Sequence, residues 1–186
     1  MKRIFDFLVA FVLLILLTPL FVILTVVIKV SDWGPALYWS KRVGRNNNIF
    51  LMPKFRTMSV NTPQVATHLL EKPESYLIWG GSFIRKTSLD ELPQLLSILY
   101  GKMSFVGPRP ALFNQDDLVE LRTKEGVHHL IPGLTGYAQI NGRDDISIEE
   151  KVKLDKEYLL KKSFLFDLKI IYLTAHQVII GKNISH

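Results

Sequence analysis

The chain has 186 residues, a formal net charge of +6 and no cysteine. This length suits one compact domain with a modest core, and the lack of cysteine excludes disulfides and thiolate metal sites. The basic balance, with a pI near 9.5, indicates an anionic partner such as nucleic acid, an anionic membrane surface or a phosphorylated substrate.

An almost wholly apolar segment opens the chain, from Ile4 to Ile28. As a straight helix of about 25 residues it would be long enough to cross a bilayer. The run is too long for a secretory signal, and no small-x-small cleavage pattern follows it. We therefore expect a membrane element that is retained.

The topology of this element has two interpretations. Lys2 and Arg3 precede it and Lys29 follows it, so the positive-inside rule favours the cytoplasm at both ends. Thr18 and Pro19 lie near its middle, where proline breaks a helical hydrogen bond and threonine can bond back to the preceding turn. A kinked helix that enters and leaves on one face explains both observations, but a plain single span with a proline kink remains open.

Two short strands, residues 36–43 and 49–56, are predicted to pair as a hairpin through the turn-rich residues 44–48. Lys54 and Arg56 would share one face of the second strand. Such a cationic pair suits an anion site, although exposed basic strand faces are ordinary.

Adjacent acids, Asp90 and Glu91, stand in the sequence RKTSLDELPQ at residues 85–94. Ser88 and Glu91 have the spacing of a capping box, which would place Asp90 in the first turn of a helix, where orphan amides favour negative charge. A helix that starts one turn later, with Pro93 near its first position, fits equally well. Taken alone, the stretch could simply be a well-capped helix start with two solvated acids.

A stiff loop follows, in which Pro108 and Pro110 bracket Arg109. Prolines force their neighbours into extended conformations, and a preorganised arginine suits two-pronged binding of phosphate or carboxylate. Residues 114–117 are expected to cap a helix that runs to about Glu125.

The remaining third is punctuated by glycines and then helical. In residues 131–143 we expect a short strand at 137–140 that delivers Arg143; the stretch is neither a Walker loop nor a dinucleotide fingerprint. Residues 148–161 predict a charged helix that carries Asp155 and Tyr158. The last segment has helical spacing and could lie in the membrane interface or pack on the core.

Four ordered motifs carry a family resemblance: KFRTM at 54–58, RKTSLDELPQ at 85–94, MSFVGPRP at 103–110 and PGLTGYAQINGR at 132–143. With the apolar N-terminus they cover nearly the whole chain, which resembles the bacterial sugar transferases. These are monotopic polyprenyl-phosphate phosphoglycosyl transferases, here in their minimal catalytic form.

The resemblance implies an α+β, helix-dominated fold. It comprises a re-entrant, kinked membrane helix (1–30) broken at Thr18 and Pro19, and a catalytic domain (31–186) on the cytoplasmic face of the bacterial inner membrane. The domain would carry a small β-hairpin and amphipathic interfacial helices around the active site. Relatives usually have serine before the proline, and the apolar residues 76–81 depart from their more polar pattern.

The resemblance also implies a reaction. A sugar 1-phosphate passes from a UDP-sugar to undecaprenyl phosphate with release of UMP, through a covalent phosphosugar on Asp90, and this step initiates glycan assembly. Glu91 is the partner of Asp90, Mg²⁺ is the cofactor with Asp90 as its ligand, and membrane lipids but no nucleic acid are partners. Substrate-binding residues are expected at Lys54, Arg56, Arg85, Arg109, Arg143, Asp155 and Tyr158.

Two other functions remain open from the residues. A membrane-bound phosphohydrolase would use the same acids with water. A basic module that binds anionic lipid would explain the charge and the last helix, but gives the acidic pair and the stiff arginine loop no purpose. No single residue names the sugar.

Overall fold

A computed structural model describes residues 2–63, 73–142 and 146–180. Its helices are long at the two ends of the chain and short between them, and its two sheets have two strands each, so the predicted helix-dominated α+β fold is confirmed. The helices are α1 (Lys2–Ser31), α2 (Gly81–Lys86), α3 (Gln94–Leu99), α4 (Asp116–Lys124), α5 (Tyr137–Ile140), α6 (Ile148–Lys161) and α7 (Phe164–Ile180). The strands are β1 (Leu37–Val43), β2 (Ile49–Phe55), β3 (Ser104–Val106) and β4 (Gly133–Thr135).

The predicted hairpin is confirmed. β1 and β2 pair antiparallel from Leu37 opposite Phe55 to Val43 opposite Ile49. The turn between them contains the single 3₁₀ turn Arg45–Asn47, in which Asn46 and Asn47 have positive φ. Asparagine tolerates this conformation better than most residues, so the run of asparagines allows the tight reversal.

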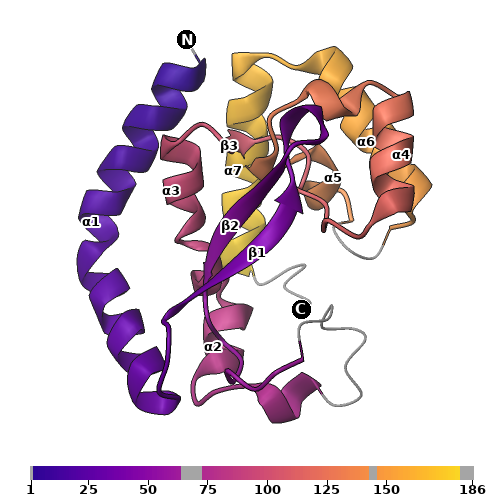
Figure 1. The fold of residues 1–186 in the computed structure, drawn as a ribbon. Coiled ribbons are helices and arrows are strands. Elements are labelled where there is room, and N and C mark those ends of the chain that lie inside the picture. The colour runs from indigo at the N-terminus through magenta and orange to yellow at the C-terminus, as the bar shows by residue number, and fades with distance from the viewer. Residues whose placement is uncertain (1, 64–72, 143–145, 181–186) are drawn as a thin grey trace.

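Helix α1 runs along one side of the molecule, beside the short helix α3 (Figure 1). Its first half packs through Ala10 on a core that includes Ile98 of α3 and Met103. Its second half packs through Leu24 and Ile28 on a second core with Phe55. Many other apolar side chains of α1 are exposed, from Ile4 at 65% to Val30 at 80%, as expected of a surface that meets lipid.

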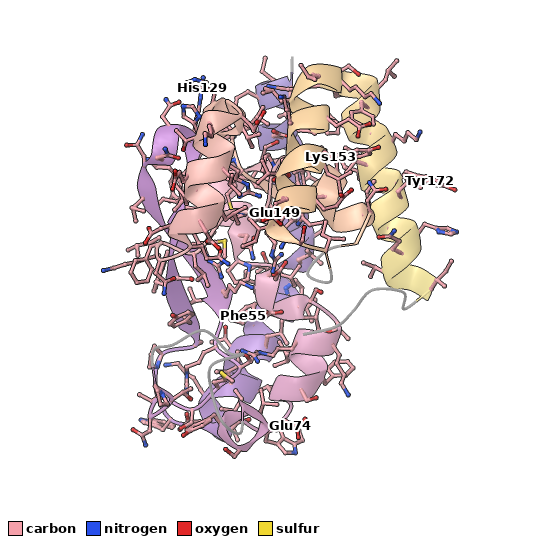
Figure 2. All side chains as sticks on the ribbon, turned by 90° about the vertical axis from the view of Figure 1, so that its right-hand side faces the viewer. Phe55, Glu74, His129, Glu149, Lys153 and Tyr172 are labelled. Carbon is pink, nitrogen blue, oxygen red and sulfur yellow. The ribbon has the colours of Figure 1, made fainter. Side chains whose placement is uncertain are left out.

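The C-terminal helices cover the opposite side. α4, α5 and α6 cluster around the end of the hairpin turn, and α7 crosses behind the hairpin (Figure 1). Seen from the side, Tyr172 projects outward from α7 (Figure 2), and it is 68% exposed. The helix over 148–161 has the predicted bounds, and residues 137–140 form the helical turn α5 where we predicted a strand. The strand is the preceding segment, β4, because residues 133–135 pair in parallel with β3.

Candidate active site

The acidic pair lies in η4 (Leu89–Glu91), a 3₁₀ turn between α2 and α3. Ser88 has φ 56°, in the left-handed region, and its side chain makes no capping hydrogen bond. An N-cap residue needs an extended backbone, so the predicted capping box is wrong. The alternative start is confirmed, since Pro93 directly precedes α3. Asp90 and Glu91 are not solvated acids, because they are only 6% and 8% exposed.

Cations from two other elements meet this pair. Lys54 of β2 places its Nζ 2.8 Å from Glu91 Oε1 and 3.5 Å from Asp90 Oδ2. Arg109 places its Nη2 3.3 Å from Glu91 Oε1. The predicted Lys54, Arg109, Asp90 and Glu91 therefore form one cluster, although they lie up to 55 positions apart (109 − 54 = 55).

Arg85 reaches the same cluster from the end of α2. Its Nε donates to Thr57 Oγ1 at 2.9 Å, and its charge acts on Asp90. Burial lowers the pKa of Arg85, and the negative charge of Asp90 opposes that effect. The guanidinium remains charged at neutral pH, so it adds positive potential beside the carboxylate.

Asp90 is a partly desolvated carboxylate whose pKa is set by opposing effects. Burial raises its pKa, as does the adjacent Glu91, whereas Lys54 and Arg85 act in the opposite direction. Its Oδ1 is buried and accepts no hydrogen bond from the part of the chain that the structure describes. A buried oxygen without a partner is costly, and such costs are retained most often where a ligand or reacting group completes the site.

The loop that carries Arg109, predicted to be stiff, is held through two of its carbonyls and through close packing at its base. The Arg109 carbonyl accepts from Arg122 Nη1 at 2.8 Å, and the Pro110 carbonyl accepts from Arg42 Nη1 at 3.2 Å. Below it, the β3 and β4 backbones approach so closely that a Cβ on Gly133 would lie 2.1 Å from the Gly107 nitrogen. The glycines allow this contact, and the contact fixes the base of the loop.

Asp155 and Tyr158, predicted to bind substrate, have no hydrogen bond to the acidic pair among the described residues. They are 1% and 2% exposed, so neither has a surface with which to bind substrate. Asp155 Oδ2 accepts from Arg122 at 2.6 and 3.0 Å. Tyr158 donates to Asp167 Oδ1 at 2.7 Å, a bond that together with burial raises its pKa. Both residues act as supports, Asp155 for the Arg109 loop through Arg122 and Tyr158 for α7.

Arg56 is also not part of the cluster. Its guanidinium pairs with the Asp32 carboxylate and donates to the Pro35 carbonyl at 2.6 Å, so it fastens the segment that follows α1. Arg56 lies one residue beyond the end of β2, and its side chain turns to Asp32 and Pro35 while Lys54 turns to the acidic pair. Arg143 lies outside the described residues.

The predicted break in α1 is present. Thr18 Oγ1 donates to the Leu14 carbonyl at 2.8 Å, and the arms Lys2–Leu16 and Thr18–Ser31 meet at a bend of 61°. Within the described residues, none of the helices taken singly has the length and hydropathy to cross a bilayer, whereas these two arms satisfy that test together. The bend is compatible with a re-entrant helix.

Comparison with known proteins agrees with the motifs. The sequence profile described as bacterial sugar transferase matches residues 1–181. The chain belongs to the bacterial sugar transferase family.

Relatives of two sizes share this bacterial sugar transferase region. The chain is 39% identical to the exopolysaccharide production protein ExoY of Sinorhizobium fredii, covering 97% of this chain and 86% of the relative. It is 40% identical to the sugar transferase EpsL of Bacillus subtilis, covering 100% and 90%. It is 34% identical to the UDP-glucose:undecaprenyl-phosphate glucose-1-phosphate transferase of Escherichia coli, covering 98% of this chain but 41% of that longer protein.

Sequence reasoning missed three residues that position this transferase site. Arg122 was one basic residue in a charged helix, and nothing local indicated that it pairs with Asp155. Asp6 is 3% exposed and its Oδ2 accepts from Ser104 Oγ at 2.8 Å. Arg3 donates to the carbonyls of Ile98 and Leu99 at the end of α3. An aspartate inside an apolar run was the one available signal, because an acid there needs a partner.

Proposed function

We propose that this chain transfers a sugar 1-phosphate from a UDP-sugar to a polyprenyl phosphate such as undecaprenyl phosphate, and so begins assembly of a surface glycan. Membership of the bacterial sugar transferase family supports the reaction class. The observation that carries the proposal is the buried Asp90 carboxylate beside Lys54 and Arg85, and one oxygen of this carboxylate has no hydrogen-bond partner among the described residues.

In the first step an Asp90 oxygen attacks the phosphorus that bears the sugar. The new bond joins carboxylate and phosphorus, the bond from that phosphorus to the bridging oxygen breaks, and UMP leaves with the electron pair. The product is an acyl phosphate, which is reactive enough to pass its phosphoryl group onward. In the second step an acceptor phosphate oxygen attacks the same phosphorus and the Asp90 carboxylate leaves, so no net proton transfer is required.

The cations of the cluster stabilise the charge that moves in both steps. Lys54 and Arg109 already contact Glu91, and Arg85 lies near Asp90. Fixed positive groups in a partly desolvated site stabilise a phosphoryl transition state without having to reorganise. Glu91 holds Lys54 and Arg109 in position until the phosphates arrive.

The residues fit Mg²⁺, which we propose as the cofactor. Among the described residues no group of three or more His, Cys, Asp or Glu side chains could hold a metal ion. Mg²⁺ usually binds through one or two carboxylates plus substrate phosphates and water, and the unpartnered Oδ1 of Asp90 can supply one such ligand. When bound, the ion would neutralise charge on the diphosphate.

Placement on the cytoplasmic face of the bacterial inner membrane is also part of the proposal. The first residues of α1 bind α7 and α3, through Lys2 to Asp167 and Arg3 to Leu99. The last residue, Ser31, donates to the Trp79 carbonyl at 3.2 Å. Because both ends of α1 contact the same domain, a re-entrant helix fits these contacts better than a span that would separate its ends across the bilayer.

The decisive experiment uses labelled UDP-sugar and purified protein without acceptor. We expect label to stay on the wild-type protein with release of UMP, and we expect Asp90→Asn to abolish both. Asp116→Asn, at an exposed aspartate of α4, is the matched control. Full turnover by Asp90→Asn would refute the nucleophile. Undecaprenyl phosphate is then added to the labelled protein, and release of free sugar phosphate with no lipid-linked sugar would assign hydrolysis instead.

A further inference from the structure

A cavity of about 360 Å³ opens directly beside the acidic pair. Its walls come from α1, α3, β3 and α7 and are mainly apolar, including Leu13, Leu17, Leu95, Phe105, Ile171 and Val178. Glu91 and Arg109 also line it. Its volume lies within the range of roughly 300–1,000 Å³ that small-molecule sites occupy. We call this space the apolar groove.

Most polar groups on its walls bond to one another or to the backbone, while the buried Oε1 of Gln139 accepts no hydrogen bond within the described residues. Thr135 and Thr174 bond to each other through their hydroxyls at 2.7 Å, and Gln177 donates to the Ile140 carbonyl at 2.9 Å. A nucleoside would require open hydrogen-bonding groups for its base and ribose. The groove instead suits a hydrocarbon chain whose anionic end meets Arg109.

Two features connect the groove with the membrane element. Leu13 and Leu17 line it from α1, and they lie just before and at the 61° bend between the two arms of that helix. On the opposite wall Ala175 and Val178 of α7 are exposed to the outside, with Val178 at 50%. The groove is therefore open along α7 while its far wall belongs to the helix that enters the lipid.

We propose that the apolar groove binds the first isoprene units of the polyprenyl phosphate acceptor and delivers the acceptor phosphate to Arg109. This inference rests on the proposed transferase function. The bent part of α1 then has a second role, since Leu13 and Leu17 form a wall along which a prenyl chain passes from the bilayer to Asp90. The site so assigned takes a hydrocarbon chain with an anionic phosphate at its end.

The test fills the groove from each wall. Ala175→Trp adds bulk from α7 and Leu13→Trp adds bulk from α1. His176→Trp, at an exposed neighbour outside the groove, is the matched control. Each variant is assayed in vesicles of phosphatidylglycerol and phosphatidylethanolamine, first for label retained from UDP-sugar alone. It is then assayed for kcat/KM with undecaprenyl phosphate and with methyl phosphate, which has no prenyl chain.

We expect both groove variants to lower kcat/KM for undecaprenyl phosphate by roughly tenfold or more, because each displaced methylene weakens apolar binding several-fold. Labelling from the donor and turnover of methyl phosphate should match the control. Unchanged kcat/KM for undecaprenyl phosphate in both variants would overturn the assignment.

Other results would overturn it in recognisable ways. Loss of donor labelling in folded groove variants would mean that the groove binds the nucleotide sugar. Loss of vesicle binding with an unchanged preference for undecaprenyl phosphate would mean that it binds phospholipid chains. Absence of label on the wild-type protein would contradict the proposed function itself, and with it the acceptor. Thermal unfolding of each variant separates these results from misfolding.

Discussion

Replacing Lys54 by methionine tests the electrostatic basis of the site most directly. The substitution keeps a long apolar stem but removes the ammonium that lies 3.5 Å from Asp90 Oδ2 and 2.8 Å from Glu91 Oε1. At 3.5 Å and an effective dielectric constant of about 20, the attraction to Asp90 alone is roughly 5 kcal/mol. Water that enters the space recovers part of this, and removal of one partner from a buried ion pair costs about 3–5 kcal/mol overall.

The two adjacent carboxylates respond by retaining a proton. Burial already raises the pKa of Asp90, and Lys54 is the first of the groups that oppose the rise, so its removal raises that pKa further. Only the carboxylate attacks phosphorus. We therefore expect the donor labelling rate of Lys54→Met at neutral pH to fall by about tenfold or more, because a free-energy change of about 1.4 kcal/mol corresponds to a tenfold change. The rate should recover as the pH is raised.

The assay is the initial rate of label transfer from UDP-sugar across a pH series, without acceptor. In the wild-type protein the rate should fall on acidification at a pH above that of an ordinary aspartate, because its folded pKa is raised. Lys54→Arg keeps the charge and serves as the matched control. A uniform loss of rate in Lys54→Met, with the pH dependence unshifted, would mean that Lys54 binds the donor phosphates without tuning Asp90.

Three further predictions follow from the same contacts. Asp90→Asn should unfold at the same or a higher temperature than wild type at neutral pH. A carboxyl whose pKa is raised in the folded protein lowers the stability of the protein as pH rises through that pKa. The difference in unfolding temperature between variant and wild type should therefore vanish in acid. Marked destabilisation of the variant at neutral pH would contradict this reasoning. Arg122→Met should cost about 3–5 kcal/mol by stranding Asp155. Combining it with Asp155→Leu should restore thermal stability but not kcat, because the Arg109 carbonyl still lacks the hydrogen bond from Arg122. Restored kcat would show that the Arg122–Asp155 pair contributes to stability alone. Pro19→Ala should straighten α1 and let an impermeant reagent label a cysteine at position 4 in some intact cells, and unchanged protection would show that the bend does not set topology.

Local sequence patterns predicted the elements whose causes are local. The hairpin and the helix over 148–161 have their turn and cap signals within a few residues. At the start of that helix Ser147 has an extended backbone, and its side chain accepts from the Glu150 amide at 3.2 Å. The same Ser-x-x-Glu spacing at Ser88 and Glu91 gives no cap, because Ser88 is a left-handed residue just after the end of α2. The pattern is identical, and the preceding helix decides the outcome.

The contacts of individual site residues could not be predicted, because they join residues that lie far apart in the sequence. Lys54 and Arg56 are two positions apart, yet one meets the acidic pair and the other fastens Asp32. Asp155 was expected to bind substrate, but it pairs with Arg122, which in turn bonds the Arg109 carbonyl. The motif resemblance grouped Lys54, Asp90, Glu91 and Arg109, which the structure brings together. It could not separate these residues from those, such as Asp155, that contact their supports.

The contacts of α1 connect this helix to both segments that carry the proposed active site. Arg3 binds the carbonyls at the end of α3, and α3 begins just after Glu91. Asp6 binds Ser104 at the start of β3, and β3 leads into the Arg109 loop. The first turns of α1 are therefore tied to both segments that supply the active site, while Leu13 and Leu17 wall the apolar groove. If α1 enters the bilayer as proposed, a helix fixed in this way would hold the acidic pair at a set distance from the bilayer surface, where the phosphate of a prenyl acceptor would lie.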